Sequence, residues 1–284
     1  MADFSDATLV VLGHGSTKNP RSSATVFQHA SEIRARHIFK EVREAFWKQE
    51  PQVQAILEEV SSPRVFIVPA FISEGYFSEK IIPRELGFDE ARPFPWARPY
   101  ERGQLYYCKP IGTHQGMTEV VVSRAQEIVR KFPFPREPGP GQITLFLAGH
   151  GTEQEANSRV AIERQAELIR DQKIYADVQA IFLEEEPRID ACYRLARTRH
   201  LVVVPFFVSD GMHVEEDIPI LLGEAERIVR KRLQAGQPTW RNPTEREGKM
   251  VWYTASVGSA PGVAEIIVER AREAAREEGT SHGC

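Results

Sequence analysis

The sequence predicts an α/β protein made of two related lobes, each a parallel sheet with helices on both faces. The first observation behind this prediction is an internal repeat. Residues 8–16 match residues 144–152, and residues 65–71 match residues 201–207, both 136 positions later. A third match joins residues 112–116 to residues 258–262. Matches that recur in the same order indicate two copies of one structural unit.

The second observation is the alternation of short apolar runs with helical patterns. The apolar runs are four to seven residues long, as expected for strands of a parallel sheet that is covered on both faces. We expect roughly four such strands in each lobe. Helical spacing predicts helices over residues 22–49, 157–172, 117–129, 189–198 and 263–276, and Pro51 would end the first of them.

Three further segments complete the expected organisation. A shorter match pairs residues 53–59 with residues 178–184, which leaves too few residues before the strand at 65–71 for a crossover helix. Either the first lobe lacks that helix or its strand order differs from the expected one. The proline-bearing stretches 89–103 and 235–249 are expected to be surface loops or lids. The segment 132–141 is rich in proline and glycine and divides the chain into lobes 1–135 and 141–284.

Composition excludes several classes of protein. The 284 residues carry a formal net charge of −4, so no basic field indicates a nucleic-acid partner. No apolar run reaches the roughly 20 residues that a membrane-spanning helix needs. Three cysteines without a CxxC spacing argue against a disulfide framework, and we expect a reduced, cytoplasmic setting.

Two histidines follow predicted strands and are the candidate functional residues. His150 stands between Gly149 and Gly151, at the carboxyl end of a strand, where open α/β sheets bind their ligands. His213 follows the strand at 201–207 and precedes three acids, Glu215, Glu216 and Asp217. Two imidazoles on neighbouring loops suit a borderline divalent metal. The alternative is that His150 bonds a backbone carbonyl and that the acids form the solvated first turn of a helix.

These segments resemble a known family, the sirohydrochlorin cobaltochelatases, which are ATP-independent enzymes that insert cobalt or iron into tetrapyrroles. The resemblance lies in the loop Gly-His-Gly-Ser/Thr, the segment Pro-Phe-Phe…Gly-Met-His…Asp-Ile-Pro and the glycine-bounded helix start, and it covers residues 8–130 and 143–275. It implies two flavodoxin-like lobes of the chelatase fold. By position, His150 and His213 match the two metal-handling histidines of the family.

The first half departs from that pattern. The position that matches His213 is Phe77, which cannot bind a metal, so the complete site is expected in the second half. Glu79 is a candidate third ligand or proton acceptor, with a solvated helix residue as the alternative. His14 is a candidate for a direct role in the site, and the alternative is that it is only a structural copy of His150.

The resemblance also implies a chemistry. A divalent metal would enter sirohydrochlorin or a related ring as the ring loses two pyrrolic protons. Cobalt is the first expectation for this metal and iron the second, and no nucleotide would be needed. Neutral imidazole is available near pH 7, since its ordinary pKa is about 6.5, and His150 and His213 would serve as metal ligands and general bases. Further candidates would contact the ring or its carboxylates, unless the aromatic ones are simply core residues: Phe206, Phe207, Met212, Arg159, Lys18 and Arg84.

Two other functions stay open at the level of sequence. A non-catalytic carrier of tetrapyrrole or metal could have kept the fold and lost turnover, as the change at position 77 suggests. A phosphate-ester hydrolase could use His14 or His150 as nucleophile, but no arginine stands beside either histidine to hold the phosphate. A two-lobed chelatase could act as a monomer, with a tetrapyrrole as its partner.

Overall fold

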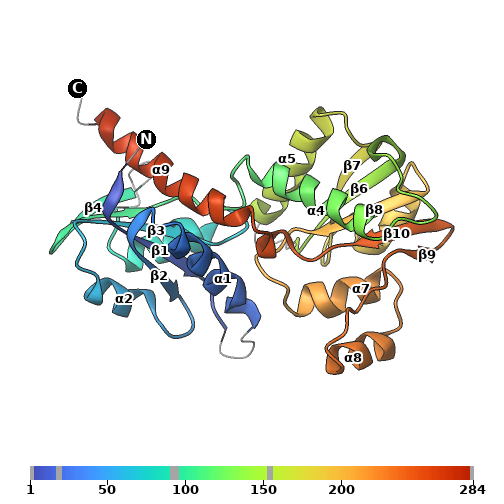
Figure 1. The fold of residues 1–284 in the computed structure, drawn as a ribbon, viewed down its shortest axis with the longest axis horizontal. Coiled ribbons are helices and arrows are strands. Elements are labelled where there is room, and N and C mark those ends of the chain that lie inside the picture. Colours follow the sequence, from blue (N-terminus) through green and yellow to red (C-terminus); the bar gives the residue numbers. More distant parts are fainter. Residues whose placement is uncertain (1–2, 17–20, 90–95, 152–155, 282–284) are drawn as a thin grey trace. The chain divides into compact units, whose positions relative to one another are not determined.

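The computed structural model describes residues 3–16, 21–89, 96–151 and 156–281. Within it the chain forms two compact units (Figure 1). Unit 1 contains residues 1–114 and 261–284, and unit 2 contains residues 115–260. Each unit is an α/β structure built on one sheet, so the predicted fold class is confirmed. No helix in the described ranges is long and apolar enough to cross a bilayer.

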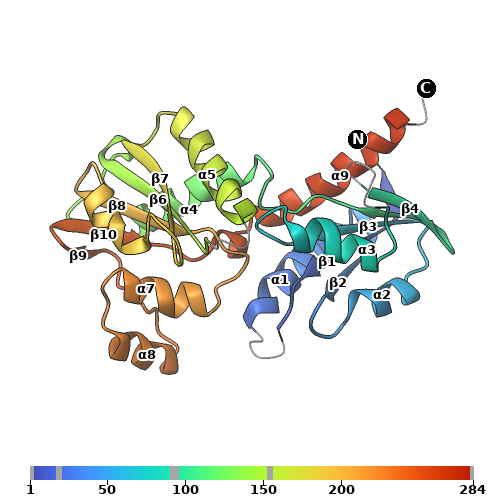
Figure 2. The same ribbon diagram turned by 180° about the vertical axis from the view of Figure 1, so that it is seen from behind.

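The sheet of unit 1 has the strand order β2-β1-β3-β5-β4. Strands β2, β1, β3 and β5 are parallel, and the edge strand β4 is antiparallel to β5. Helix α1 (Arg21–Ala35) packs on one face with α9 (Val263–Ser281), and α2 (Val53–Glu59) and α3 (Ile82–Glu85) contribute to the apolar core of the other face (Figure 2). The strands are β1 (Phe4–Gly13), β2 (Phe39–Phe46), β3 (Arg64–Pro69), β4 (Trp96–Tyr100) and β5 (Gly103–Tyr107).

The sheet of unit 2 repeats this topology in the order β7-β6-β8-β10-β9, again with an antiparallel edge. Its strands are β6 (Ile143–Gly149), β7 (Asp177–Phe182), β8 (His200–Pro205), β9 (Thr244–Arg246) and β10 (Lys249–Tyr253). Its α-helices are α4 (Met117–Lys131), α5 (Ala156–Asp171), α6 (Cys192–Leu195), α7 (Ile218–Leu221) and α8 (Glu226–Gln234). The equal strand order explains the repeat in the sequence.

The last helix of each repeat packs in the unit formed by the other repeat. Helix α4 belongs to the first repeat but packs against α5, β8 and β10 of unit 2, whereas α9 packs against α1 and β3 of unit 1. The expected lobes 1–135 and 141–284 therefore differ from the compact units. A sequence repeat records which segments were copied, and it does not record which sheet each helix covers.

An arginine side chain holds each of the exchanged helices. Arg270 of α9 is 6% exposed and donates to the carbonyl of Pro110 and the hydroxyl of Thr113, both at 2.9 Å. Arg124 of α4 donates to the Ser259 hydroxyl at 2.9 Å. Burial raises the pKa of Glu273, but hydrogen bonds from His114 and Arg270 outweigh it and lower that pKa to about 2. The arginine of each helix thus binds the loop that precedes the other helix in the sequence.

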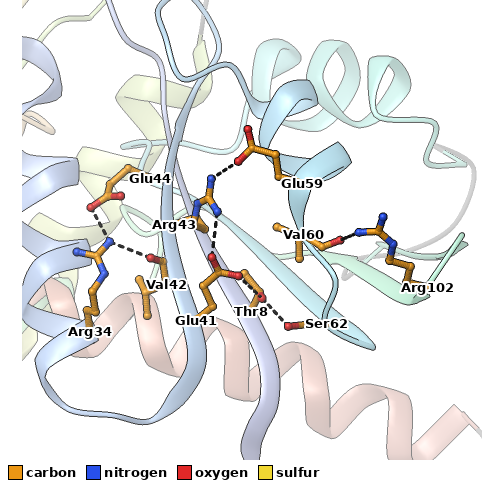
Figure 3. A network of polar contacts seen from close by, with 10 residues as sticks. All are labelled: Thr8, Arg34, Glu41, Val42, Arg43, Glu44, Glu59, Val60, Ser62 and Arg102. Atoms are coloured by element: carbon orange, nitrogen blue, oxygen red, sulfur yellow. Dashed lines mark hydrogen bonds and ion pairs between the residues drawn. The ribbon is translucent and has the colours of Figure 1, made fainter.

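Residues 36–49 do not continue the helix that the sequence predicted. Helix α1 ends at Ala35, His37 has a positive φ of 53°, and residues 39–46 form β2 beside β1. The buried positions of β2 are spaced three and four residues apart, which imitates a helix. The side chain of Arg34 fastens the strand by donating to the carbonyl of Val42 and the carboxylate of Glu44, both at 2.8 Å (Figure 3). Pro51 accordingly follows a strand.

The match between residues 53–59 and 178–184 was wrong. Residues 53–59 are helix α2, and residues 178–182 belong to β7. At the repeat offset of 136, α2 corresponds to residues 189–195, which form the 3₁₀ turn η3 (Ile189–Ala191) and α6. The first lobe has therefore lost no helix, and the predicted helix 189–198 ends at Leu195.

The two proline-bearing stretches contain edge strands. Residues 96–107 form the antiparallel pair β4–β5, and residues 244–253 form the pair β9–β10. In the second pair the two connecting residues, Glu247 and Gly248, both have positive φ angles, of 48° and 72°. This is the backbone of a tight two-residue hairpin, which the sequence signals only weakly because Gly248 alone is a turn residue.

Candidate metal-handling site

His150 is held in a tight turn at the carboxyl end of β6. The N–H of Glu184 donates to the carbonyl of His150 at 3.2 Å, which ties the turn to the end of β7. Both flanking glycines are required sterically. A Cβ on Gly149 would lie 2.0 Å from Cδ1 of Ile162, and Gly151 has a φ of +62° that side chains rarely adopt. The sequence Gly-His-Gly therefore presents one imidazole, 34% exposed, at this strand end.

His213 reaches the same place from a different element. It is the first residue of the π-helical turn η4 (His213–Asp217), which follows β8. The next residue, Val214, is buried, and its carbonyl accepts a hydrogen bond from the buried hydroxyl of Tyr253 at 2.6 Å. The ring centroids of His150 and His213 are 4.9 Å apart, with the ring planes at 84°. The structure therefore brings together the two histidines that the sequence selected.

Two carboxylates complete the arrangement. Nδ1 of His213 lies 2.6 Å from Oδ2 of Asp217, four residues later in the same turn. Asp217 accepts the proton on Nδ1, which leaves the lone pair of the other ring nitrogen, Nε2, available to a metal. Oε1 of Glu184 lies 3.7 Å from Nε2 of His150. Sequence reasoning missed both roles. Asp217 was visible only as one of three acids, and Glu184 was the last residue of a segment that had been matched wrongly.

This set of groups suits a metal ion that is bound transiently. Among the described residues no three histidine, cysteine or acidic side chains are arranged as a metal-holding group. Two imidazoles leave most of the coordination shell of a divalent ion open for another ligand. The arrangement is therefore more suited to a metal that is passed on than to a permanent structural ion.

The matching place in unit 1 is aromatic. His14 follows β1, and its ring centroid lies 5.3 Å from that of Phe77, the first residue of the π-helical turn η1 (Phe77–Ile81). Nδ1 of His14 is 2.9 Å from the carbonyl oxygen of Gly15, a backbone contact of the kind that the sequence left open as the alternative for His150. Burial and the neighbouring Glu74 raise the pKa of half-buried Glu79 above its ordinary value. Neither His14 nor Glu79 belongs to the pair of imidazoles in unit 2.

The remaining candidates occupy varied environments. Phe206 is 1% exposed and is a core residue, so its predicted contact with a ligand is replaced by packing. Phe207 is half-buried, with its ring centroid 6.0 Å from that of His213, and the adjacent Met212 is 59% exposed.

Of the predicted cations, Arg159 is engaged by two carboxylates, those of Glu163 at 2.8 Å and Glu185 at 3.2 Å. Arg84 is exposed on α3. Lys18 lies outside the described residues. Thus Phe207 has a ring beside that of His213, and Arg159 is already paired with two carboxylates.

A two-sheet α/β protein with paired imidazoles at neighbouring strand ends matches a defined class of proteins, the chelatases. A solved multi-domain protein of Deinococcus radiodurans, described as structurally similar to chelatases, superposes with a TM-score of 0.74 at 27% identity, over 93% of this chain and 54% of that one. SirB of Bacillus subtilis with Fe³⁺ superposes with a TM-score of 0.67 at 20% identity, over 96% of this chain and 97% of that one, which shows the shared fold.

The family model described as CbiX matches residues 8–128 and again residues 144–274, so the chain belongs to the CbiX family. A curated relative from Halobacterium salinarum, named probable sirohydrochlorin cobaltochelatase, is 39% identical over 94% of this chain and 91% of its own length. The sirohydrochlorin cobaltochelatase of Methanopyrus kandleri is 27% identical over 48% of this chain and 99% of its own length. The relative from Methanopyrus thus corresponds in length to one repeat.

Proposed function

We propose that this protein is an ATP-independent chelatase that inserts a divalent metal, cobalt first and iron next, into sirohydrochlorin. The observation that carries the proposal is the pair His150 and His213, with ring centroids 4.9 Å apart at two strand ends of unit 2. Relatives named sirohydrochlorin cobaltochelatase supply the substrate and the metal. The metal is a substrate of this reaction, and no nucleotide takes part.

The proposed chemistry begins with capture of the ion. Nε2 of His213 offers a lone pair because Asp217 accepts the proton of Nδ1. His150 approaches from β6 and supplies a second nitrogen ligand. The partly exposed imidazoles, 34% and 40% accessible, allow a hydrated ion to reach them. Borderline divalent ions such as cobalt and iron accept imidazole ligands readily.

Insertion then requires proton transfer away from the ring. As the divalent ion enters, two pyrrolic N–H bonds break, both electron pairs bind the metal, and two protons leave. Once His150 has released the ion to the ring, its free nitrogen is the proposed acceptor of each proton in turn, and Glu184, 3.7 Å from Nε2 of His150, is the proposed route from the imidazole toward solvent. The net exchange is one divalent ion for two protons, so no redox partner is needed.

One chain would suffice for this reaction, because both imidazoles lie within unit 2. We propose a monomer working in the cytoplasm on a tetrapyrrole partner. The thiols of Cys108 and Cys192 are free and buried, which fits a reducing compartment, and burial raises the pKa of Cys192 to about 12.

The competing function is a carrier that binds ring or metal without turnover. It was suggested by Phe77, but Phe77 belongs to unit 1, whereas both histidines of the pair belong to unit 2. Anaerobic incubation of the protein with sirohydrochlorin and Co²⁺, Fe²⁺ or Ni²⁺, followed by absorbance, separates the two functions. We expect the spectrum of the metallated ring to appear faster than without protein. Binding without accelerated insertion for any of these metals would reject the chelatase.

A further inference from the structure

The two units carry opposite chemistry at matching positions. The register is defined by the backbone as well as by the sequence, because the N–H of Lys48 donates to the carbonyl of His14 at 2.9 Å just as that of Glu184 donates to His150. At the offset of 136, His213 is replaced by Phe77, Asp217 by Ile81 and Glu184 by Lys48. At three of the four positions, an imidazole or a carboxylate of unit 2 is thus replaced in unit 1 by an apolar side chain or a cation, and only the imidazole of His14 is retained.

The replacements in unit 1 build an aromatic cluster. The ring centroid of Phe77 lies 5.3 Å from that of His14, 5.7 Å from that of Trp47 and 5.9 Å from that of Phe71. Trp47 stands where unit 2 has Leu183, and its N–H binds the carbonyl of Gly13 as that of Leu183 binds Gly149. Trp47, Phe71 and Phe77 are only half-buried, and His14 is exposed.

Tyr76, the residue before Phe77, is a further exposed aromatic residue of unit 1. It is 65% exposed, and it replaces the Met212 of unit 2. A large aromatic side chain this accessible removes little of its surface from water in the protein alone. Such exposed rings are typical of surfaces that bind a flat apolar ligand.

The formal charge around the histidine pair of unit 2 also differs from that around the aromatic cluster of unit 1. In unit 2 the segments 184–186 and 213–217 carry six carboxylates and no lysine or arginine. In unit 1 the matching segments 48–50 and 77–81 carry two carboxylates, balanced by Lys48 and Lys80. The two segments of unit 2 therefore have a formal charge of −6, and the two matching segments of unit 1 have a formal charge of zero. A cation is attracted to the first set of segments, whereas an anion meets no net repulsion at the second and can pair with exposed Lys48.

We propose that the aromatic cluster of unit 1, made of His14, Trp47, Phe71, Tyr76 and Phe77, is a binding surface for the tetrapyrrole ring. The rings contact the flat conjugated macrocycle, and Lys48 pairs with one of its carboxylates. The inference rests on the proposed function, because it takes the ring from there. In this inference the first repeat, which has no histidine pair, recognises the organic substrate. The second repeat handles the metal.

The test is equilibrium binding of metal-free sirohydrochlorin to the full-length protein, measured by calorimetry in the presence of a chelator. Three substitutions install the residue that unit 2 carries at the same place, so each is compatible with the fold: Trp47→Leu, Lys48→Glu and Tyr76→Met. We expect each to weaken binding, with a Kd at least five times higher for Lys48→Glu and Trp47→Leu. Tyr76 and Lys48 are exposed, so these two variants decide the matter if Trp47→Leu fails to fold.

Matched controls make the result specific. Lys40→Glu changes the same charge at the opposite end of β2, and Phe134→Leu removes an aromatic ring that is 54% exposed in the segment between the repeats. Both should alter the Kd by less than twofold. Wild-type affinity in Tyr76→Met and Lys48→Glu would overturn the inference. Since the titration contains no metal, a protein that binds the ring in this pattern but inserts no metal would reject the proposed function and leave the binding surface standing.

Discussion

Replacing Asp217 by asparagine tests whether the histidine pair is tuned by its carboxylate neighbour. The substitution keeps the shape of the side chain and removes its charge. Nδ1 of His213 and Oδ2 of Asp217 are 2.6 Å apart, which is the short range of a charge-assisted hydrogen bond. Without the carboxylate, the proton is no longer held on Nδ1, and the form of the ring with its proton on Nε2 competes for the metal-binding nitrogen.

The size of the effect follows from the exposure of the pair. Loss of such an outer partner usually costs about 10- to 100-fold in metal affinity or activity. The side chains of His213 and Asp217 are 40% and 38% exposed, so water replaces part of the interaction. We therefore expect the lower end, about tenfold, which corresponds to roughly 1.4 kcal/mol.

The assay combines anaerobic titration with Co²⁺ and initial rates of insertion. A matched control is Glu216→Gln, which removes the same charge from the same turn. Glu216 is paired with Arg230 at 3.2 Å and contacts neither imidazole, so we expect less than a threefold change. The variant Asp217→Glu should recover part of the affinity. Equal losses in Asp217→Asn and Glu216→Gln would show that general charge, and not the orientation of His213, controls the metal, and the reasoning would be refuted.

Two further predictions concern the division of labour and acid stability. His150→Ala or His213→Ala should abolish insertion with an unchanged circular dichroism spectrum, whereas His14→Ala should keep a substantial fraction of the rate when sirohydrochlorin is saturating. Equal inactivity of a folded His14→Ala at saturating sirohydrochlorin would contradict the assignment of the metal-handling site to unit 2. The pKa of Glu273 is about 2 in the folded protein, below its ordinary value of 4.5, so this group stabilises the fold above about pH 4.5 and the contribution is lost as the pH falls toward 2. Glu273→Gln should therefore lower the melting temperature at pH 7 more than at pH 3, and an equal loss at both values would contradict the low pKa.

The internal repeat made most of the fold predictable from the sequence. Neighbouring residues alone indicate the strand-ending glycines and the apolar runs, because both recur in the repeat. They also indicate His150 and His213, because each stands in a local pattern. The helices at 117–129 and 263–276 were predicted for the same reason, and the structure contains them as α4 and α9. Local spacing also misled in one place, since the buried positions of β2 have the separation of a helix face.

The partners of the two histidines were beyond reach of the sequence. Asp217 lies within hydrogen-bonding distance of His213 because the two side chains, four residues apart, lie on one face of the helical turn at 213–217. Glu184 approaches His150 because β7 runs beside β6. Both contacts depend on the path of the backbone in space, and the spacing of four residues between His213 and Asp217 is a signal only where that segment is known to be helical.

The sequence by itself determined the class of fold, the repeat, the pair His150–His213 and the absence of that pair in the first half, because each of these is written in local patterns and their spacing. Only the tertiary structure decided which sheet each final helix covers. Helices α4 and α9 have similar amphipathic patterns and similar arginines, so either sheet could accept either helix as far as periodicity shows. Their exchange is established by contacts between residues far apart in the chain, such as Arg270 with Pro110, 160 positions away. Distance in space, and not order along the chain, selects the helix that each sheet buries.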